Sequence, residues 1–158
     1  MELDNTVLLV DADVARPSLL NVLGLPPTKG LMDVLVNQAT DLSEVLLRTS
    51  VQKLSILPAG TPHPKATELL ASDAMTQLLE EMATRYADRI LIFDSPPLLV
   101  TTESRVLATH MGQIVVVVEA ERGANTFIVT EAEVVIFAEP YPIVIGSAML
   151  YGLQHSRQ

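Results

Sequence analysis

The sequence predicts an α/β protein with a mainly parallel sheet flanked by helices. Residues 7–10 form an apolar run that is too short for a typical helix and rich in Val and Leu, which predicts a strand buried on both faces. A second strand of this kind is expected at residues 90–93, and helical patterns lie between the two. This alternation of strands and helices favours right-handed crossovers and parallel pairing.

The other elements follow from periodicity and from the residues that begin and end helices. Ser18, Asp41 and Ser72 are expected to cap helices, and Gly24 stands where a helix should end. We expect, in chain order, short helices at 19–23, 31–36 and 42–47, a strand at 54–57, helices at 73–86 and 102–110, and a Val-rich strand at 113–119.

The chain has an atypical part from about residue 122. Residues 127–129 and 134–137 are β-branched or aromatic, although their place after a strand favours a helix. Residues 142–145 predict a last strand. Because no repeat, linker or low-complexity segment divides the sequence, we expect residues 1–158 to form a single domain.

Composition excludes several classes of protein. The net charge of −9 argues against a broad nucleic-acid interface, which needs a basic face. The absence of cysteine excludes disulfides and thiolate metal sites. The first residues carry no basic run typical of a signal peptide, and the longest aliphatic run, residues 114–118, is too short to span a membrane. We therefore expect a cytoplasmic protein.

Carboxylates follow both of the predicted Asp-bearing strands. Asp11 and Asp13 come directly after the first strand, and Asp94 follows the second. Open parallel sheets bind ligands at the carboxyl ends of their strands, so these side chains are expected to meet at one edge. Carboxylates in one place suggest a hard cation such as Mg²⁺, and hence phosphate chemistry. The alternative is that they serve only as cap and turn residues.

Three stretches carry a resemblance to a known family: VLLVDADVARPSL at 7–19, LPAGTPHPKATELLAS at 57–72 and ILIFDSPPLLVTTES at 90–104. In this order and spacing they resemble the bacterial tyrosine autokinases of exopolysaccharide biosynthesis, in particular the exosortase-associated type. These kinases are the catalytic half of chain-length determinant systems. They belong to the deviant-Walker branch of the P-loop NTPases, with the septum-site and partition ATPases. The resemblance extends over about residues 7–121.

The resemblance implies roles for the carboxylates. Asp11 and Asp13 match the Walker A′ motif, which holds water or Mg²⁺ near the γ-phosphate of ATP and helps to deprotonate the acceptor tyrosine. Asp94 matches the Walker B aspartate, and Asp13 and Asp94 are thereby the expected Mg²⁺ ligands. Arg16 is a candidate contact to phosphate or to a neighbouring subunit, or is solvated or paired with Asp13. The implied partner is a membrane-embedded chain-length determinant protein, which would hold the chain at the inner face of the membrane.

The sequence also departs from the family. No G-x-x-x-x-G-K-[ST] phosphate loop occurs in it, so we expect a P-loop-like domain truncated at its N-terminus, with weak nucleotide binding. The strand that leads into this loop would lie between the strands at 90–93 and 113–119. Its loss predicts an open slot in the sheet and self-association. The tyrosines are Tyr86, Tyr141 and Tyr151, without the family's C-terminal cluster, and Tyr151 is a candidate phosphorylation target.

Three functions therefore compete. The first is an ATP-dependent tyrosine autokinase domain that is inactive as this isolated chain. The second is a non-enzymatic fragment or pseudo-kinase that acts as an interaction module. The third is a positioning ATPase of the same superfamily, which the acidic composition disfavours. The histidines are too scattered for a zinc site: His63 is expected in a loop, His110 near a helix end and His155 in the tail.

Overall fold

The computed structural model describes residues 6–86, 89–96, 101–111, 113–114, 116–123, 126–135 and 143–148. The strands are β1 (Thr6–Asp11), β2 (Leu47–Arg48), β3 (Leu54–Leu57), β4 (Arg89–Ser95), β5 (Gln113–Ile114), β6 (Val116–Gly123), β7 (Thr126–Val135) and β8 (Ile143–Ala148). The helices are α1 (Leu19–Val22), α2 (Leu31–Val36), α3 (Leu42–Val45), α4 (Ala66–Leu70), α5 (Asp73–Arg85) and α6 (Thr102–Thr109).

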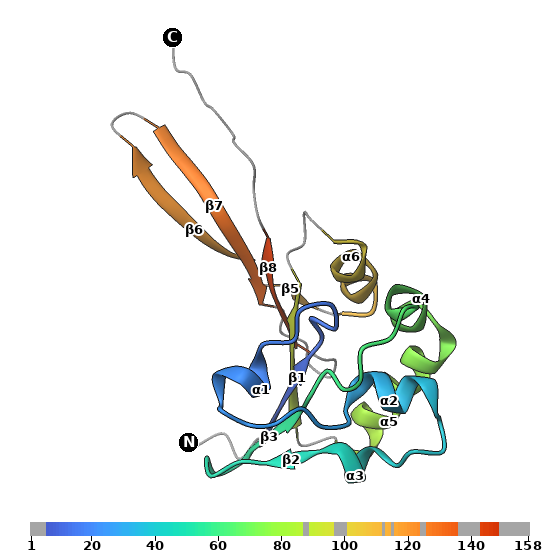
Figure 1. Ribbon diagram of the computed structural model, residues 1–158. Coiled ribbons are helices and arrows are strands. Elements are labelled where there is room, and N and C mark those ends of the chain that lie inside the picture. Colours follow the sequence, from blue (N-terminus) through green and yellow to red (C-terminus); the bar gives the residue numbers. More distant parts are fainter. Residues whose placement is uncertain are drawn as a thin grey trace.

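The strands form a mixed sheet with the order β2-β3-β1-β4-β8-β7-β6, and β5 pairs with β8 (Figure 1). β1 runs parallel to both β3 and β4, and β8 runs parallel to β4 and β5. The pairs β2–β3, β7–β8 and β6–β7 are antiparallel. The prediction of a mainly parallel sheet flanked by helices is therefore confirmed, with the antiparallel pairs towards its margins.

The core lies on one face of this sheet. Leu8 and Val10 of β1 and Phe93 of β4 are fully buried there. They belong to a cluster that also contains residues of α2, α4, α5 and α6, and Figure 1 shows these four helices together on one side of β1, apart from α1. Val7 and Leu9, which alternate with the core residues, are only half-buried. The prediction that this strand is buried on both faces is therefore wrong for the described chain, because the helices gather on one side.

The predicted open slot beside β4 is also not observed. β8 pairs in parallel with β4, with Ile92 opposite Ile143 and Asp94 opposite Ile145. The same strand pairs with β5, so it lies between the two strands that the missing family strand would have separated. β8 thus occupies the position that the sequence predicted to be vacant, because an apolar segment near the C-terminus supplies the absent backbone hydrogen bonds.

The atypical part of the chain forms a hairpin rather than a helix. β6 and β7 pair antiparallel from Val116 opposite Val134 to Gly123 opposite Thr126, with an irregularity between Glu119 and Ala120. β-branched and aromatic residues favour strands, and in this part of the chain that preference prevails over the family's alternation of strands and helices. In Figure 1 this hairpin extends away from the helices. Tyr151 and His155, as well as Tyr141, lie outside the described residues.

Most of the predicted elements are present. The helices expected at 31–36 and 73–86 and the strand expected at 54–57 agree with α2, α5 and β3 to within a residue. The short strand β2 and the helix α4 were not predicted, and the expected strand at 113–119 is divided between β5 and β6. Asp41 caps α3 through Ser43, as expected, whereas Ser18 and Ser72 stand at N-cap positions without a capping hydrogen bond from their side chains.

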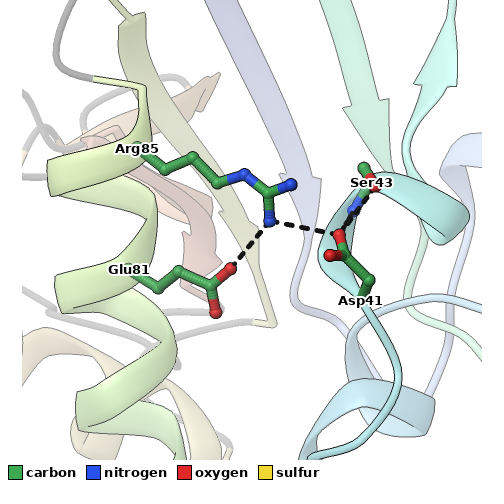
Figure 2. A network of polar contacts seen from close by, with 4 residues as sticks. All are labelled: Asp41, Ser43, Glu81 and Arg85. Carbon is green, nitrogen blue, oxygen red and sulfur yellow. Dashed lines mark hydrogen bonds and ion pairs between the residues drawn. The ribbon is translucent and has the colours of Figure 1, made fainter.

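A polar network fastens α3 to α5 (Figure 2). The Arg85 guanidinium lies 3.1 Å from Asp41 and 3.0 Å from Glu81. Asp41 also accepts hydrogen bonds from the hydroxyl and backbone N–H of Ser43. The Ser43 bonds and the Arg85 guanidinium lower the pKa of Asp41 to about 2. Since these groups are exposed, the network fixes the geometry of the helix ends more than it stabilises the fold.

Gly30 is the tightest backbone contact between α2 and the end of β3. A Cβ atom built on Gly30 would lie 2.0 Å from the carbonyl oxygen of Pro58. The N–H groups of Leu31 and Met32 donate to Pro58 and Ala59 at 2.8 and 2.9 Å, so loop 58–60 caps the start of α2. By contrast, Gly24 has a φ of +67° and nothing within 4 Å of its Cβ position.

We expect Gly30→Ala to lower the free energy of unfolding by about 3 kcal/mol, because backbone atoms must move to admit the methyl group. Gly24→Ala should cost only about 1 kcal/mol, the strain of a left-handed conformation. Urea unfolding followed by circular dichroism measures both. Equal losses in the two variants would contradict the close contact at Gly30.

Removal of β8 should expose the edge of β4. We expect a chain ending at residue 142 to self-associate through this unpaired edge. The full chain, in which β8 covers the edge, should not self-associate in this way. Size-exclusion chromatography with light scattering on the two proteins at matched concentration is the test. A truncated chain that remains a compact monomer would count against the β4–β8 pairing.

Candidate functional site at the carboxyl edge of the sheet

The two Asp-bearing strands lie side by side and end at the same level. Asp11 is the register partner of Asp94, as Leu9 is of Ile92, so alternation puts these two aspartates on the same face of the sheet. The pairing continues beyond the strand end, where the Ala12 N–H donates to the Asp94 carbonyl at 2.7 Å. Parallel pairing thus brings together two carboxylate residues that are 83 positions apart in the chain.

Asp11 is a buried carboxylate with one unpartnered oxygen. Only 1% of the residue is exposed. Its Oδ2 accepts the N–H of Leu19 at 3.2 Å, whereas Oδ1 has no hydrogen-bond partner among the described residues. Burial raises the pKa of Asp11 to about 6; the Leu19 N–H opposes this shift, and the charge of Asp13 adds to it. A buried oxygen without a hydrogen bond costs free energy, which is unusual for a residue that has only a structural role.

The Leu19 contact also explains the start of α1. Ser18 stands at the N-cap of this helix but makes no capping bond, and the Asp11 carboxylate takes one of the first free N–H groups instead. Sequence reasoning missed this link, because the donor is a backbone group eight residues away from the acceptor. The contact ties the end of β1 to the segment that follows it.

A cavity of about 170 Å³ lies beside Asp11. Ala59 and Gly60, from the loop after β3, form one part of its wall. The segment between β1 and α2 forms the rest, through Pro17, Leu20, Asn21, Leu25, Pro27 and Thr28. Four of its lining residues, Asp11, Pro17, Ala59 and Gly60, belong to two of the three stretches that carry the family resemblance. The Pro-Ala-Gly sequence at 58–60 was the available signal for its second wall.

Asp13 and Arg16 form a turn next to this cavity. The backbone N–H of Arg16 donates to Asp13 Oδ1 at 3.0 Å. Asp13 is half-buried and Arg16 is exposed. This contact involves the backbone of Arg16 and not its guanidinium, so both the pairing of the arginine side chain with Asp13 and its phosphate role stay predictions.

Asp94 is half-buried at the end of β4. In the part of the chain that the structure describes, no three His, Asp or Glu side chains lie close enough together to form a metal-binding group. Mg²⁺ often uses only one or two protein carboxylates and keeps several waters, so this finding does not test the predicted ligands. The metal role of Asp13 and Asp94 stays a prediction.

A second cavity of about 210 Å³ is lined by α2 and by the loop after β3, and the sequence analysis did not predict it. Its lining residues are Lys29, Met32, Asp33, Val36, Asn37, Thr40, Thr61, Pro62 and His63. His63 accepts the N–H of Lys65 at 3.2 Å and is a loop residue, as predicted. His110 stands at the C-cap of α6, which agrees with its expected place near a helix end.

Known proteins similar to this chain are tyrosine kinases, although no family model matches it. Tyrosine-protein kinase ptk of Acinetobacter johnsonii is 33% identical over 109 residues, 69% of this chain and 14% of that protein. Tyrosine-protein kinase YwqD of Bacillus subtilis is 30% identical over 114 residues, 72% of this chain and 47% of that protein. The chain is a homologue of the bacterial tyrosine-protein kinases.

Solved structures agree with this relationship. The kinase domain of VpsO superposes with a TM-score of 0.60 at 28% identity, covering 67% of this kinase homologue and 51% of that chain. The kinase domain of Escherichia coli tyrosine kinase ETK gives a TM-score of 0.58 at 29% identity, covering 67% and 40%. The fold class predicted from sequence, P-loop-like with helices around a mainly parallel sheet, is thereby confirmed.

The kinase homologue spans about half of YwqD and a smaller part of ptk. The activity of those complete proteins is therefore not established for this shorter chain. Among the described residues, none of the helices is long and apolar enough to cross a membrane.

The buried charge of Asp11 predicts a pH-dependent stability. Asp11 has a pKa of about 6 in the folded chain against an ordinary value of 3.8, so between these pH values the folded state holds more protons than the unfolded state. This group should therefore lower the free energy of unfolding by about 2 kcal/mol as the pH rises from 4 to above 6. Asp11→Asn should lose this decrease and be the more stable protein at pH 8.

Urea unfolding of both proteins at pH 4.5, 6 and 8 measures the effect. Glu80→Gln is the matched control, because it removes an exposed carboxylate on α5. The buried charge would be refuted if Asp11→Asn and Glu80→Gln had the same dependence on pH as the wild-type chain.

Proposed function

We propose that this chain is part of the kinase domain of a bacterial protein-tyrosine autokinase that regulates exopolysaccharide biosynthesis, and that it supplies the carboxylate edge of the nucleotide site. The observation that carries the proposal is the pairing of Asp11 with Asp94 at one level of two parallel strands, with an unpartnered Asp11 oxygen beside a cavity. The homology to tyrosine kinases supports it. Phosphoryl transfer needs positioning and neutralisation of charge more than covalent chemistry, and the carboxylates of this edge could position a Mg²⁺ ion that supplies the neutralising charge.

The oxygen donors of this edge fit a hydrated Mg²⁺ ion. Asp13 and Asp94 would hold it, as the family resemblance implies, and carboxylates are the hard ligands that this ion prefers. Bound with ATP, the ion would neutralise the charge that develops on the phosphates. The buried, unpartnered oxygen of Asp11 gives the donor set a free acceptor at the same edge.

Asp11 is the stronger candidate for the catalytic base. Burial raises its pKa to about 6, so at neutral pH it is mostly ionised yet binds a proton more readily than an exposed aspartate. In the proposed reaction it accepts the proton of the acceptor tyrosine hydroxyl. Asp13, which is only half-buried, is better suited to the metal. Arg16, exposed beside this turn, would contact phosphate.

The sequence lacks the loop that would bind the phosphates of ATP. No G-x-x-x-x-G-K-[ST] segment is present, and the backbone N–H groups and lysine of such a loop are the main phosphate contacts in P-loop proteins. We infer that the isolated chain binds Mg²⁺–ATP only at millimolar concentration or above and transfers no phosphate. By resemblance, it would work in the cytoplasm beside a membrane-embedded chain-length determinant protein, without nucleic acid.

The alternative of an interaction module is weakened by one observation. That hypothesis relied on an open slot beside β4 that a partner strand could enter, and β8 pairs there instead. The alternative of a positioning ATPase keeps the carboxylates but gains no support from the acidic composition.

Titration of the ¹⁵N-labelled chain with Mn²⁺, a paramagnetic substitute for Mg²⁺, tests the metal edge. We expect selective broadening of the amide signals of Asp11, Ala12, Asp13 and Asp94. Asp94→Asn should weaken Mn²⁺ binding by about tenfold or more, a typical effect of a change at a metal site. Glu80→Gln should leave it unchanged. Uniform broadening, or broadening centred on another acidic surface, would refute the site.

Calorimetry with Mg²⁺–ATP and a radiolabelled phosphoryl-transfer assay test the rest. The expected results are weak heat at millimolar nucleotide and no labelled protein. Micromolar binding would contradict the role assigned to the absent loop, and labelling of the isolated chain would contradict its inactivity.

A further inference from the structure

Asp33 joins the start of α2 to the loop that follows β3. Its Oδ2 accepts the N–H groups of Gly30 at 2.8 Å and Thr61 at 3.0 Å. Its Oδ1 accepts the hydroxyl of Thr61 at 2.7 Å. Burial alone would raise the pKa of Asp33, but the hydrogen bonds from Thr61 and Gly30 outweigh it and hold the pKa below the usual value. The carboxylate is therefore ionised and fully engaged at neutral pH.

The backbone is packed closely around this carboxylate. A Cβ atom on Gly60 would lie 2.4 Å from Asp33 Oδ2 and 2.8 Å from the backbone nitrogen of Gly30. Gly60 also has a φ of +89°, which other residues adopt only with strain. Loop 58–61 thus has a single close fit against α2, and Asp33 is the side chain that holds it there.

Consecutive residues of this loop line the two cavities of the site region. Ala59 and Gly60 line the cavity of Asp11, whereas Thr61 lines the second cavity together with Asp33 itself. A shift of the loop towards or away from α2 therefore changes the width of both. Of the residues in β3 and in the loop after it, Ala59 and Gly60 alone line the Asp11 cavity.

We propose that Asp33 is a positioning residue for the Asp11 cavity, acting through Thr61 and Gly30 to hold the Ala59–Gly60 wall in place. The positioning is a property of this chain, and only its consequence for nucleotide binding rests on the function proposed above. Asp33 lines the second cavity and not that of Asp11, so it acts through the loop.

The competing explanation is that Asp33 only caps a helix. Asp41 provides a matched control, because it caps α3 with bonds from Ser43 and Arg85 and lines neither cavity. If capping were the whole role of Asp33, Asp33→Asn and Asp41→Asn would have the same kind of effect. Thr61→Val and Thr61→Ser form a second pair, since only serine retains the hydroxyl that donates to Asp33.

Amide hydrogen exchange measured by NMR distinguishes the two explanations. In Asp33→Asn and Thr61→Val we expect exchange to accelerate at Gly30 and Thr61, the direct partners, and also at Leu19, whose N–H donates to the cavity-lining Asp11. The acceleration at Leu19 should be about tenfold greater than the change in global unfolding accounts for. Thr61→Ser should restore the wild-type exchange, and Asp41→Asn should leave Leu19 unaffected.

The proposal is overturned if exchange at Leu19 follows global stability in every variant, or if Asp41→Asn affects Leu19 as strongly as Asp33→Asn does. The functional arm uses the Mn²⁺ titration: Asp33→Asn should weaken selective broadening at Asp11, whereas Asp41→Asn should not. If the wild-type chain shows no selective broadening while the exchange pattern is as expected, the proposed function fails and the positioning role stands.

Discussion

The register between β1 and β4 is the interaction on which the candidate site depends. A slip of one residue in this pairing would turn Asp11 to the helix-covered face and leave Asp94 alone on the other. The register is fixed by the core, because Leu8, Val10 and Phe93 must face α2, α4, α5 and α6 together. Burial of aliphatic side chains on one face therefore places the aspartates on the opposite one, and hydrophobic packing determines the position of groups that carry charge.

The cost of this arrangement falls on Asp11. The backbone N–H groups around Asp11, of which that of Leu19 contributes most, do not compensate for burial, and one oxygen remains unpartnered among the described residues. A carboxylate in this state stabilises the fold poorly but accepts protons and cations well. The loop at 58–61 completes the enclosure from β3, held by a second carboxylate, Asp33, whose hydrogen bonds are all satisfied. The pKa values of these two acids shift in opposite directions, upward for Asp11 and downward for Asp33.

Short apolar runs identified the Asp-bearing strands correctly, and periodicity and composition identified α2, α5 and β3. The prediction of an open slot beside β4 was wrong, because another segment of the chain can pair where the family strand is missing. β8 comes from the part of the sequence with the weakest pattern, and only its contacts with β4 and β5 reveal its place. After residue 122 the sequence left helix and strand open, and a hairpin forms because the β-branched and aromatic residues favour strands.

By itself, the sequence determined the fold class, the residues of the carboxylate edge and the absence of a phosphate loop, since these depend on local composition and spacing. Tertiary structure decided that β8 lies beside β4, that Asp11 rather than Asp13 is the buried acid, and that Asp33 bonds the loop after β3. These features depend on contacts between segments far apart in the chain. Burial and hydrogen-bond partners of this kind are properties of the packed molecule, and neighbouring residues in the sequence do not encode them separately.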